Sequence, residues 1–142
     1  MTLSCARKAA LVQEHGLQGL QETSLGDPCS SPSLYELRRY RLQLGYNTVP
    51  DFLSLYGEGL PSKLEAPGTD PSTALITVMY TEVGLLNEVI ELWHHGSLSA
   101  MERSRQAARG AMPWREAIAN IAKLAVQFEN AIHKPVPFAK CQ

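Results

Sequence analysis

The order of the secondary-structure signals predicts an α+β fold of the ferredoxin-like βαββαβ type, an antiparallel sheet with helices on one face. Two observations support this prediction. The two central strand signals are separated by about six residues, a hairpin length that makes them antiparallel neighbours. The segments before and after this hairpin each carry one apolar stripe at helical spacing, as a helix needs in order to pack on a sheet. The 142 residues suffice for one such domain.

Local patterns predict the first strand and the first helix. Residues 34–42 contain no Gly or Pro and mix aromatic and apolar side chains with charged ones, which favours a strand. A stripe at spacings of four, three and four then predicts a helix. We expect this helix to end near Leu60, because Gly57, Gly59 and Pro61 weaken its last turns. The stripe consists of Val49, Leu53, Tyr56 and Leu60.

The central hairpin is expected to join strands at residues 74–81 and 88–94 around a turn at Gly84. Both faces of the first of these strands are apolar, whereas the predicted helices can cover only one face of a sheet. We therefore expect a second copy of the chain to cover the other face, which makes the protein a homodimer through the sheet. The alternation places Ile76, Val78 and Tyr80 on one side of the strand, and Leu75 and Met79 on the other.

The C-terminal third is expected to hold a polar helix at residues 98–110, a stronger helix from Pro113 and a final edge strand within residues 129–138. Pro135 and Pro137 limit that strand, because proline cannot donate a ladder hydrogen bond. The stripe of the second helix consists of Trp114, Ile118, Ile121, Ala125 and Phe128, about four turns if the helix persists that far.

Residues 1–33 are interrupted by Gly, Pro and Ser and are expected to form a poorly ordered leader before a domain at residues 34–140. Arg7 and Lys8, with no acid in the first thirteen residues, resemble the start of a mitochondrial transit peptide. The acids that follow leave a divergent terminus as the alternative.

Composition excludes several classes of function. Thirteen Lys and Arg against 14 Asp and Glu give a net charge of −1, which argues against a nucleic-acid-binding protein. No apolar run approaches the ~20 residues of a transmembrane helix. Residues 67–97 are acidic and residues 98–142 basic, which suits contact with a partner but equally describes solvated faces. Cys5, Cys29 and Cys141 have neither metal-ligand nor disulfide spacing, so no metal or cofactor is predicted.

One group of polar residues is a candidate ligand pocket. Glu36, Arg38 and Tyr40 alternate on the first strand and therefore share a face, which we expect to be the face away from the helices. They either line a polar pocket or form cross-strand ion pairs at a dimer interface. His94 is a further pocket candidate. His94 and His95 point to opposite faces of a strand and cannot ligate one metal ion together. No catalytic constellation is recognisable, and catalytic residues are not assigned.

Three stretches resemble the NIPSNAP family: the strand at residues 35–40, the hairpin at residues 81–93 and the pair Pro113-Trp114. The hairpin is the most specific of the three, since Thr-Glu-x-Gly-x-Leu-Asn leads into x-Val-x-x-Leu-Trp. The resemblance implies a dimeric α/β barrel of ferredoxin-like subunits and a mitochondrial association, with roles in vesicle traffic or in recruiting mitophagy adaptors. The residues that carry the family pattern are Glu82, Gly84, Asn87, Trp93 and Trp114.

Two hypotheses about function follow. The first is a non-catalytic, mitochondrial interaction protein that binds protein partners, with a cytoplasmic location as the alternative. The second is an enzyme or small-ligand binder of the dimeric barrel class, with Glu36, Arg38, Tyr40 and His94 around a pocket between the sheet and the partner subunit. A pocket with a convergent acid and base and room for a ligand would favour the second hypothesis.

Overall fold

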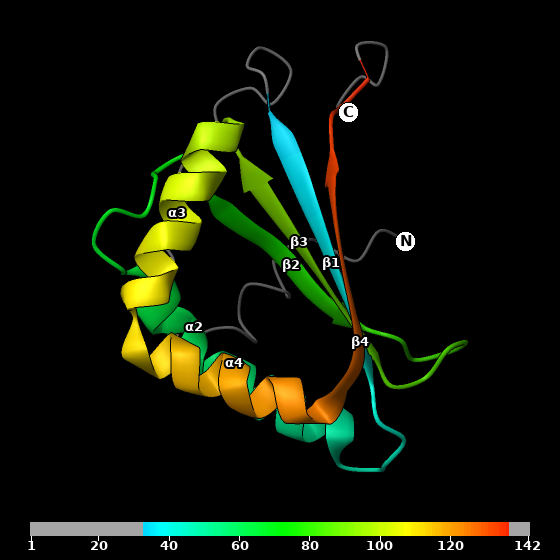
Figure 1. The fold of residues 1–142 in the computed structure, drawn as a ribbon. Helices are drawn as coiled ribbons and strands as arrows, with labels where there is room; N and C mark the ends of the chain where they lie inside the picture. Colours follow the sequence, from blue (N-terminus) through cyan, green and yellow to red (C-terminus); the bar gives the residue numbers. More distant parts are fainter. Residues whose placement is uncertain (1–32, 137–142) are drawn as a thin grey trace, which may run out of the picture.

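The computed structural model describes residues 33–136, which form one four-stranded sheet and three helices (Figure 1). Residues 1–32 of the leader predicted at residues 1–33, and the last residues of the predicted C-terminal strand, lie outside the described part. The elements in chain order are β1 (Leu34–Leu42), α2 (Thr48–Leu64), β2 (Ala74–Tyr80), β3 (Glu88–His95), α3 (Leu98–Gly110), α4 (Met112–Leu124) and β4 (Ala125–His133).

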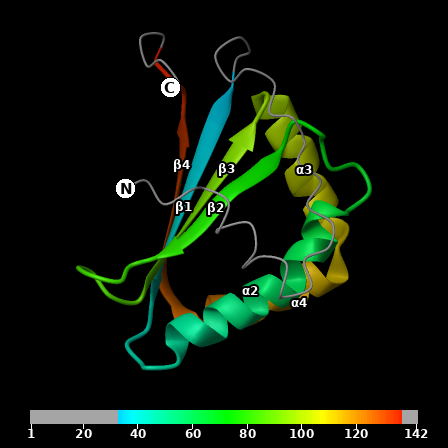
Figure 2. The ribbon, with the colours of Figure 1, turned by 180° about the vertical axis from the view of Figure 1, so that it is seen from behind.

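The sheet has the strand order β2-β3-β1-β4, and every neighbouring pair is antiparallel. Figures 1 and 2 show all three helices on the same side of the sheet, so its other face is open among the described residues. The prediction of an α+β, ferredoxin-like fold is therefore confirmed. The predicted β1 and α3 have the bounds that the sequence pattern gave.

Aromatic side chains form the centre of the core. Tyr40 of β1 packs against Phe52 of α2 with ring centroids 5.1 Å apart, and Tyr56 meets Trp114 of α4 at 5.4 Å. Phe52 and Val89 are completely buried. Each large ring removes much apolar surface from water, so this cluster fixes α2 and α4 on the β1–β3 half of the sheet.

Helix α2 continues one turn beyond the predicted end. Pro61 lies inside it, and the helix still closes a hydrogen bond from the Glu65 N–H to the Pro61 carbonyl, 3.0 Å long. The proline costs one donor, but the buried face of α2 runs past it through Gly59 to Lys63. Burial of that face outweighs the local signals for helix termination, which makes the expected end near Leu60 wrong.

Helix α4 ends earlier than its apolar stripe suggested. Its last carbonyls, those of Leu124 and Lys123, accept hydrogen bonds of 2.8 and 2.9 Å from the backbone and side chain of Gln43, just after β1. The chain is thereby anchored beside β1 and continues as β4 from Ala125, with Phe128 on the strand rather than on the helix. The predicted start of the last strand at residue 129 was four residues late. The apolar residues from 125 to 128 fit the spacing of a helix as well as that of a strand.

The side chains of β2 do not alternate as predicted, because the strand contains an irregularity. The pairing with β3 shifts between Leu75 and Thr77, so that Leu75 faces Trp93 and Val78 faces Glu91. Leu75 and Val78 therefore share the helix-facing side and pack against the core. The expectation that Leu75 lies opposite Val78 is wrong, because a strict period of two does not pass through a bulge.

Candidate functional site

A cavity of about 840 Å³ lies between the helix-facing side of the sheet and helices α3 and α4. Its volume is in the range of small-molecule binding sites. Phe128 on its β4 side is 52% exposed, so the cavity communicates with solvent. Every Lys, Arg, Asp or Glu in its described lining is a cation, namely Arg38, Lys63, Arg105, Arg109 and Arg115.

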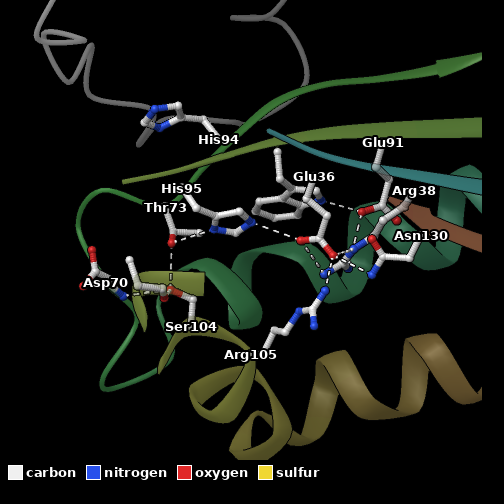
Figure 3. A network of polar contacts seen from close by, with 12 residues as sticks. Glu36, Arg38, Asp70, Thr73, Glu91, His94, His95, Ser104, Arg105 and Asn130 are labelled. Carbon is white, nitrogen blue, oxygen red and sulfur yellow. Dashed lines mark hydrogen bonds and ion pairs between the residues drawn. The ribbon is translucent and has the colours of Figure 1, made fainter. Parts of the chain in front are cut away.

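Beneath this lining, Glu36 holds a network that joins three strands to α3 (Figure 3). Arg38 contacts both carboxylate oxygens of Glu36, at 2.8 and 3.1 Å. The Glu36 carboxylate, completely buried, also contacts His95 Nε2 at 3.0 Å and accepts hydrogen bonds from Arg105 at 2.6 Å and Asn130 at 2.8 Å. Burial of this charge is tolerated because every contact comes from a donor group.

The network determines the charge of Glu36. Burial acts to raise the pKa of a carboxyl group, but hydrogen bonds from His95 and Arg38 outweigh it and hold the pKa of Glu36 well below its usual range. Because Glu36 is then an acceptor, His95 donates from Nε2. The Thr73 hydroxyl lies 3.0 Å from Nδ1, which makes a chain from Glu36 through His95 to Thr73.

Arg38 is shared between two buried carboxylates. Its guanidinium contacts Glu36 and lies 3.7 Å from Glu91, which also accepts a hydrogen bond of 2.6 Å from the indole N–H of Trp93. Burial raises the pKa of the neighbouring Tyr40 and Tyr56 hydroxyls, and the charge of Glu91 raises it further, so both phenols stay protonated. Two carboxylates and one central cation thus sit behind the cavity wall.

Lys63 differs from the residues of the Glu36 network, because its charged group has no hydrogen-bond partner in the described chain. It lies in the last turn of α2, its Nζ is 3.5 Å from the ring centroid of Trp93 and 4.5 Å from that of Trp114, and it makes no hydrogen bond within the described chain. Burial, followed by repulsion from Arg38, lowers the pKa of Lys63 to about 7.

The structure brings three of the four predicted pocket residues together and separates the fourth. Arg38 and Tyr40 line the cavity and Glu36 lies behind Arg38, but on the helix-facing side of the sheet, so the expected orientation away from the helices is wrong. The pocket accordingly lies between sheet and helices of one chain rather than between sheet and partner. His94 points to the open face, as Figure 3 shows, where it contacts Tyr35 and the Ser72 carbonyl.

The residues of the family pattern divide into two groups. Trp93 and Trp114 line the cavity. Gly84 and Asn87 shape the hairpin, since both adopt positive φ, 122° and 59°, and Asn87 donates a 2.9 Å hydrogen bond to the Gln43 carbonyl. Glu82 is exposed in the same hairpin. The hairpin residues thus have conformational roles.

Sequence reasoning missed several site residues, and each for a separate reason. Lys63 fell beyond the predicted end of α2, although it continues the buried spacing of Phe52, Tyr56 and Gly59. His95 and Glu91 share the face of Trp93, which strand alternation alone would have shown. Arg105 and Asn130 come from distant elements and carry no local signal.

Neither a metal site nor a membrane span is found in residues 33–136. No group of three or more potential His, Cys, Asp or Glu ligands comes together there. No helix in the same residues is long and apolar enough to cross a membrane.

Comparisons with known proteins agree with the fold. A crystal structure of a NIPSNAP family protein of unknown function from Agrobacterium tumefaciens matches with a TM-score of 0.65 and 27% identity over 78% of this chain and 94% of that one. An uncharacterized NIPSNAP domain protein from Burkholderia xenovorans matches with a TM-score of 0.63 and 25% identity over 76% and 99%. No curated protein matches the chain. Residues 35–140 match the model of the NIPSNAP family, and the chain therefore belongs to this family.

Proposed function

We propose that this protein binds a small organic anion with an apolar body in the cavity between its sheet and its helices. The observation that carries the proposal is the charge of the lining, in which the described Lys and Arg side chains face no acidic lining residue. Glu36 and Glu91, behind the lining, offset the charges of Arg38 and Arg105, and Arg109 lies 3.9 Å from Glu102. The remaining arginine of the lining, Arg115, would attract a carboxylate or similar anion.

The aromatic walls suit the rest of such a ligand. Trp93 and Trp114 contribute large apolar faces, and Ile118 and Phe128 extend that surface toward α4 and β4. Arg115 has no ion-pair partner among residues 33–136, and its guanidinium makes a weak contact of 3.8 Å with the sulfur of Met112. It is therefore well suited to attract an anion at the edge of the cavity.

The two tryptophans provide the assay, because the chain contains two and both line the cavity. We expect 3-phenyllactate to quench their fluorescence saturably, and its neutral amide to bind at least about tenfold more weakly. Arg115→Gln should weaken binding of the acid, whereas the matched variant Arg41→Gln, an exposed strand residue, should not. Equal binding of acid and amide, or no saturable quenching by either, would contradict the proposal.

We also propose that the open face of the sheet joins two copies of the chain. Ile76 and Met79 are 42% and 44% exposed in single copies, and Leu37 and Leu92 pair at the centre of this face. An apolar sheet face of this kind favours a partner. Light scattering during size-exclusion chromatography should give a dimer, and Leu92→Lys a monomer. Leu85→Lys, in the exposed hairpin, is the control and should stay dimeric. A monomeric parent chain would refute this assembly.

The cellular role is proposed on the family resemblance. We propose that the protein acts at mitochondria as a non-catalytic interaction protein, in vesicle traffic or in recruiting mitophagy adaptors. A tagged full-length chain should then co-localise with mitochondria, and deletion of residues 1–33 tests whether the leader directs it there. A uniform cytoplasmic signal from the full-length chain would contradict this proposal. The ligand site and the proposed dimer interface are compatible, since they lie on opposite faces of the sheet.

A further inference from the structure

The most unusual group in the cavity is the amine of Lys63. Lysine normally keeps its ammonium group in water even when its stem is buried. Here the residue is 9% exposed, lines the cavity and has no hydrogen-bond acceptor at Nζ within residues 33–136. Phe52, Tyr56 and Gly59 form the buried face of α2, and Lys63 continues that face, so the helix itself holds the amine inside.

The groups that face Nζ act in opposite directions. The faces of Trp93 and Trp114 stabilise the ammonium form, as do the more distant carboxylates of Glu36 and Glu91. Burial and the guanidinium groups of Arg38 and Arg105 disfavour it. The net result lowers the pKa of Lys63 to about 7, so a large share of the side chain is a neutral amine at physiological pH. A neutral amine in a solvent-connected cavity is a nucleophile.

The surroundings of this amine select one class of electrophile. Arg38 lies 5.7 Å from the centroid of the Trp93 ring, and Lys63 Nζ lies 3.5 Å from the same centroid. An amine and a guanidinium are thus held over one indole. Nζ itself is buried against the two indole rings, so a carbonyl group meets the amine once the side chain of Lys63 turns into the cavity that it lines. A carboxylate on the same small molecule then meets the cationic lining. This combination is the chemistry of an oxo acid.

We infer that Lys63 forms an imine with the carbonyl carbon of an oxo acid bound in the cavity, an inference that rests on the proposed anion site. The lone pair of Nζ attacks the carbonyl carbon to give a carbinolamine. A C=N bond then replaces the C=O bond, and the carbonyl oxygen leaves as water with the two amine protons. The step involves no oxidation or reduction.

Reductive trapping of the full-length protein tests the inference. Phenylpyruvate with sodium cyanoborohydride near neutral pH should add one probe less one oxygen atom per chain, and peptide mapping should place it on Lys63. Lys63→Arg, which keeps the cation, should lower the trapped fraction at least about tenfold. Lys123→Arg removes an exposed lysine of α4 and should trap like the parent protein. Circular dichroism checks that each variant is folded, and mapping of the parent protein gives the result independently of any variant.

Two related probes separate the possible failures. Phenyllactate has the carboxylate without the carbonyl, and should quench the tryptophans without forming an adduct. Phenylacetone has a ketone carbonyl without the carboxylate, and should be trapped several-fold more slowly. Quenching by both acids with no adduct, or adducts spread over surface lysines, would overturn the imine while leaving the anion site intact. Absence of both quenching and adduct would overturn the two together.

Discussion

Strands β3 and β4 flank β1 on its two sides, and both pair with it antiparallel, yet their surroundings differ. The helix-facing residues Val89, Glu91, Trp93 and His95 of β3 are at most 2% exposed. Those of β4, including Phe128 and Ile132, are 52% and 39% exposed. The difference shows that helix packing covers one half of the sheet and leaves the other half as the wall of the cavity.

Removing one buried and one exposed carboxylate should give the largest difference in stability. Glu36→Ala leaves the buried Arg38 and His95 without their common acceptor and should cost about 3–5 kcal/mol of unfolding free energy. Glu129→Ala on β4 removes a surface ion pair with Arg39, 3.4 Å long, and should cost less than about 1 kcal/mol. Urea denaturation of the two variants measures the difference, and equal losses would show that the two halves are equally covered.

Apolar truncation on the two strands should give the next largest contrast. Val89→Ala opens a cavity in a fully buried part of β3 and should cost about 2 kcal/mol. Phe128→Ala removes a larger side chain, but one that is half exposed on β4, and should cost about 1 kcal/mol or less. Thermal unfolding ranks the two. A larger loss at Phe128 would mean that the β4 side is covered in solution.

The approach of α4 to α2 decides how much of the sheet the helices reach. A Cβ added at Gly59 would lie 2.5 Å from the Cβ of Ala117, so Gly59→Ala should push the helices apart and cost about 1–3 kcal/mol. Gly57 has nothing within 4 Å, and Gly57→Ala should instead stabilise the helix by about 0.5–1 kcal/mol. Denaturant titrations should show a lower free energy of unfolding for the Gly59 variant and a higher one for the Gly57 variant. The same sign at both sites would contradict the close contact.

Lys63, at the boundary of the two halves, should give an effect that depends on pH. The pKa of Lys63 is lowered from 10.5 to about 7, so between these values the unfolded chain binds more protons than the folded one. The free energy of unfolding should therefore rise with pH in this window, by up to about 1.4 kcal/mol per pH unit. Below pH 7 the buried ammonium group of Lys63 should destabilise the folded state to its full extent. Lys63→Met should remove that part of the slope. An unchanged slope in the variant would show that Lys63 titrates normally.

The sequence predicted the fold from features that are local. Element order, the short Gly84 hairpin and the apolar stripe predicted for α2 suffice for a ferredoxin-like topology, and the bounds of β1 and α3 follow from the same patterns. The errors occurred where tertiary contacts decide. Pro61 signals a helix end, but packing of the buried face of α2 against the core carries the helix past it. Gln43 ends α4 from a distant part of the chain.

The candidate site was predictable only in part. Alternation correctly grouped Glu36, Arg38 and Tyr40, but alternation does not say which face the helices cover. Both faces of β1 carry arginine and an apolar or aromatic residue, so composition could not decide between them. The contribution of Arg105 depends on how α3 crosses the sheet, and that information is absent from any local pattern.

The partners of Glu36 also constrain the order of folding. His95, Arg105 and Asn130 are 59, 69 and 94 residues away along the chain, so the carboxylate cannot be satisfied until β3, α3 and β4 have all docked on β1. Until then its charge is better solvated by water than by an incomplete set of donors. The network therefore belongs to the final consolidation of the native state, where it slows unfolding more than it accelerates folding. The proposed anion site is therefore expected to form only after β3, α3 and β4 have docked on β1.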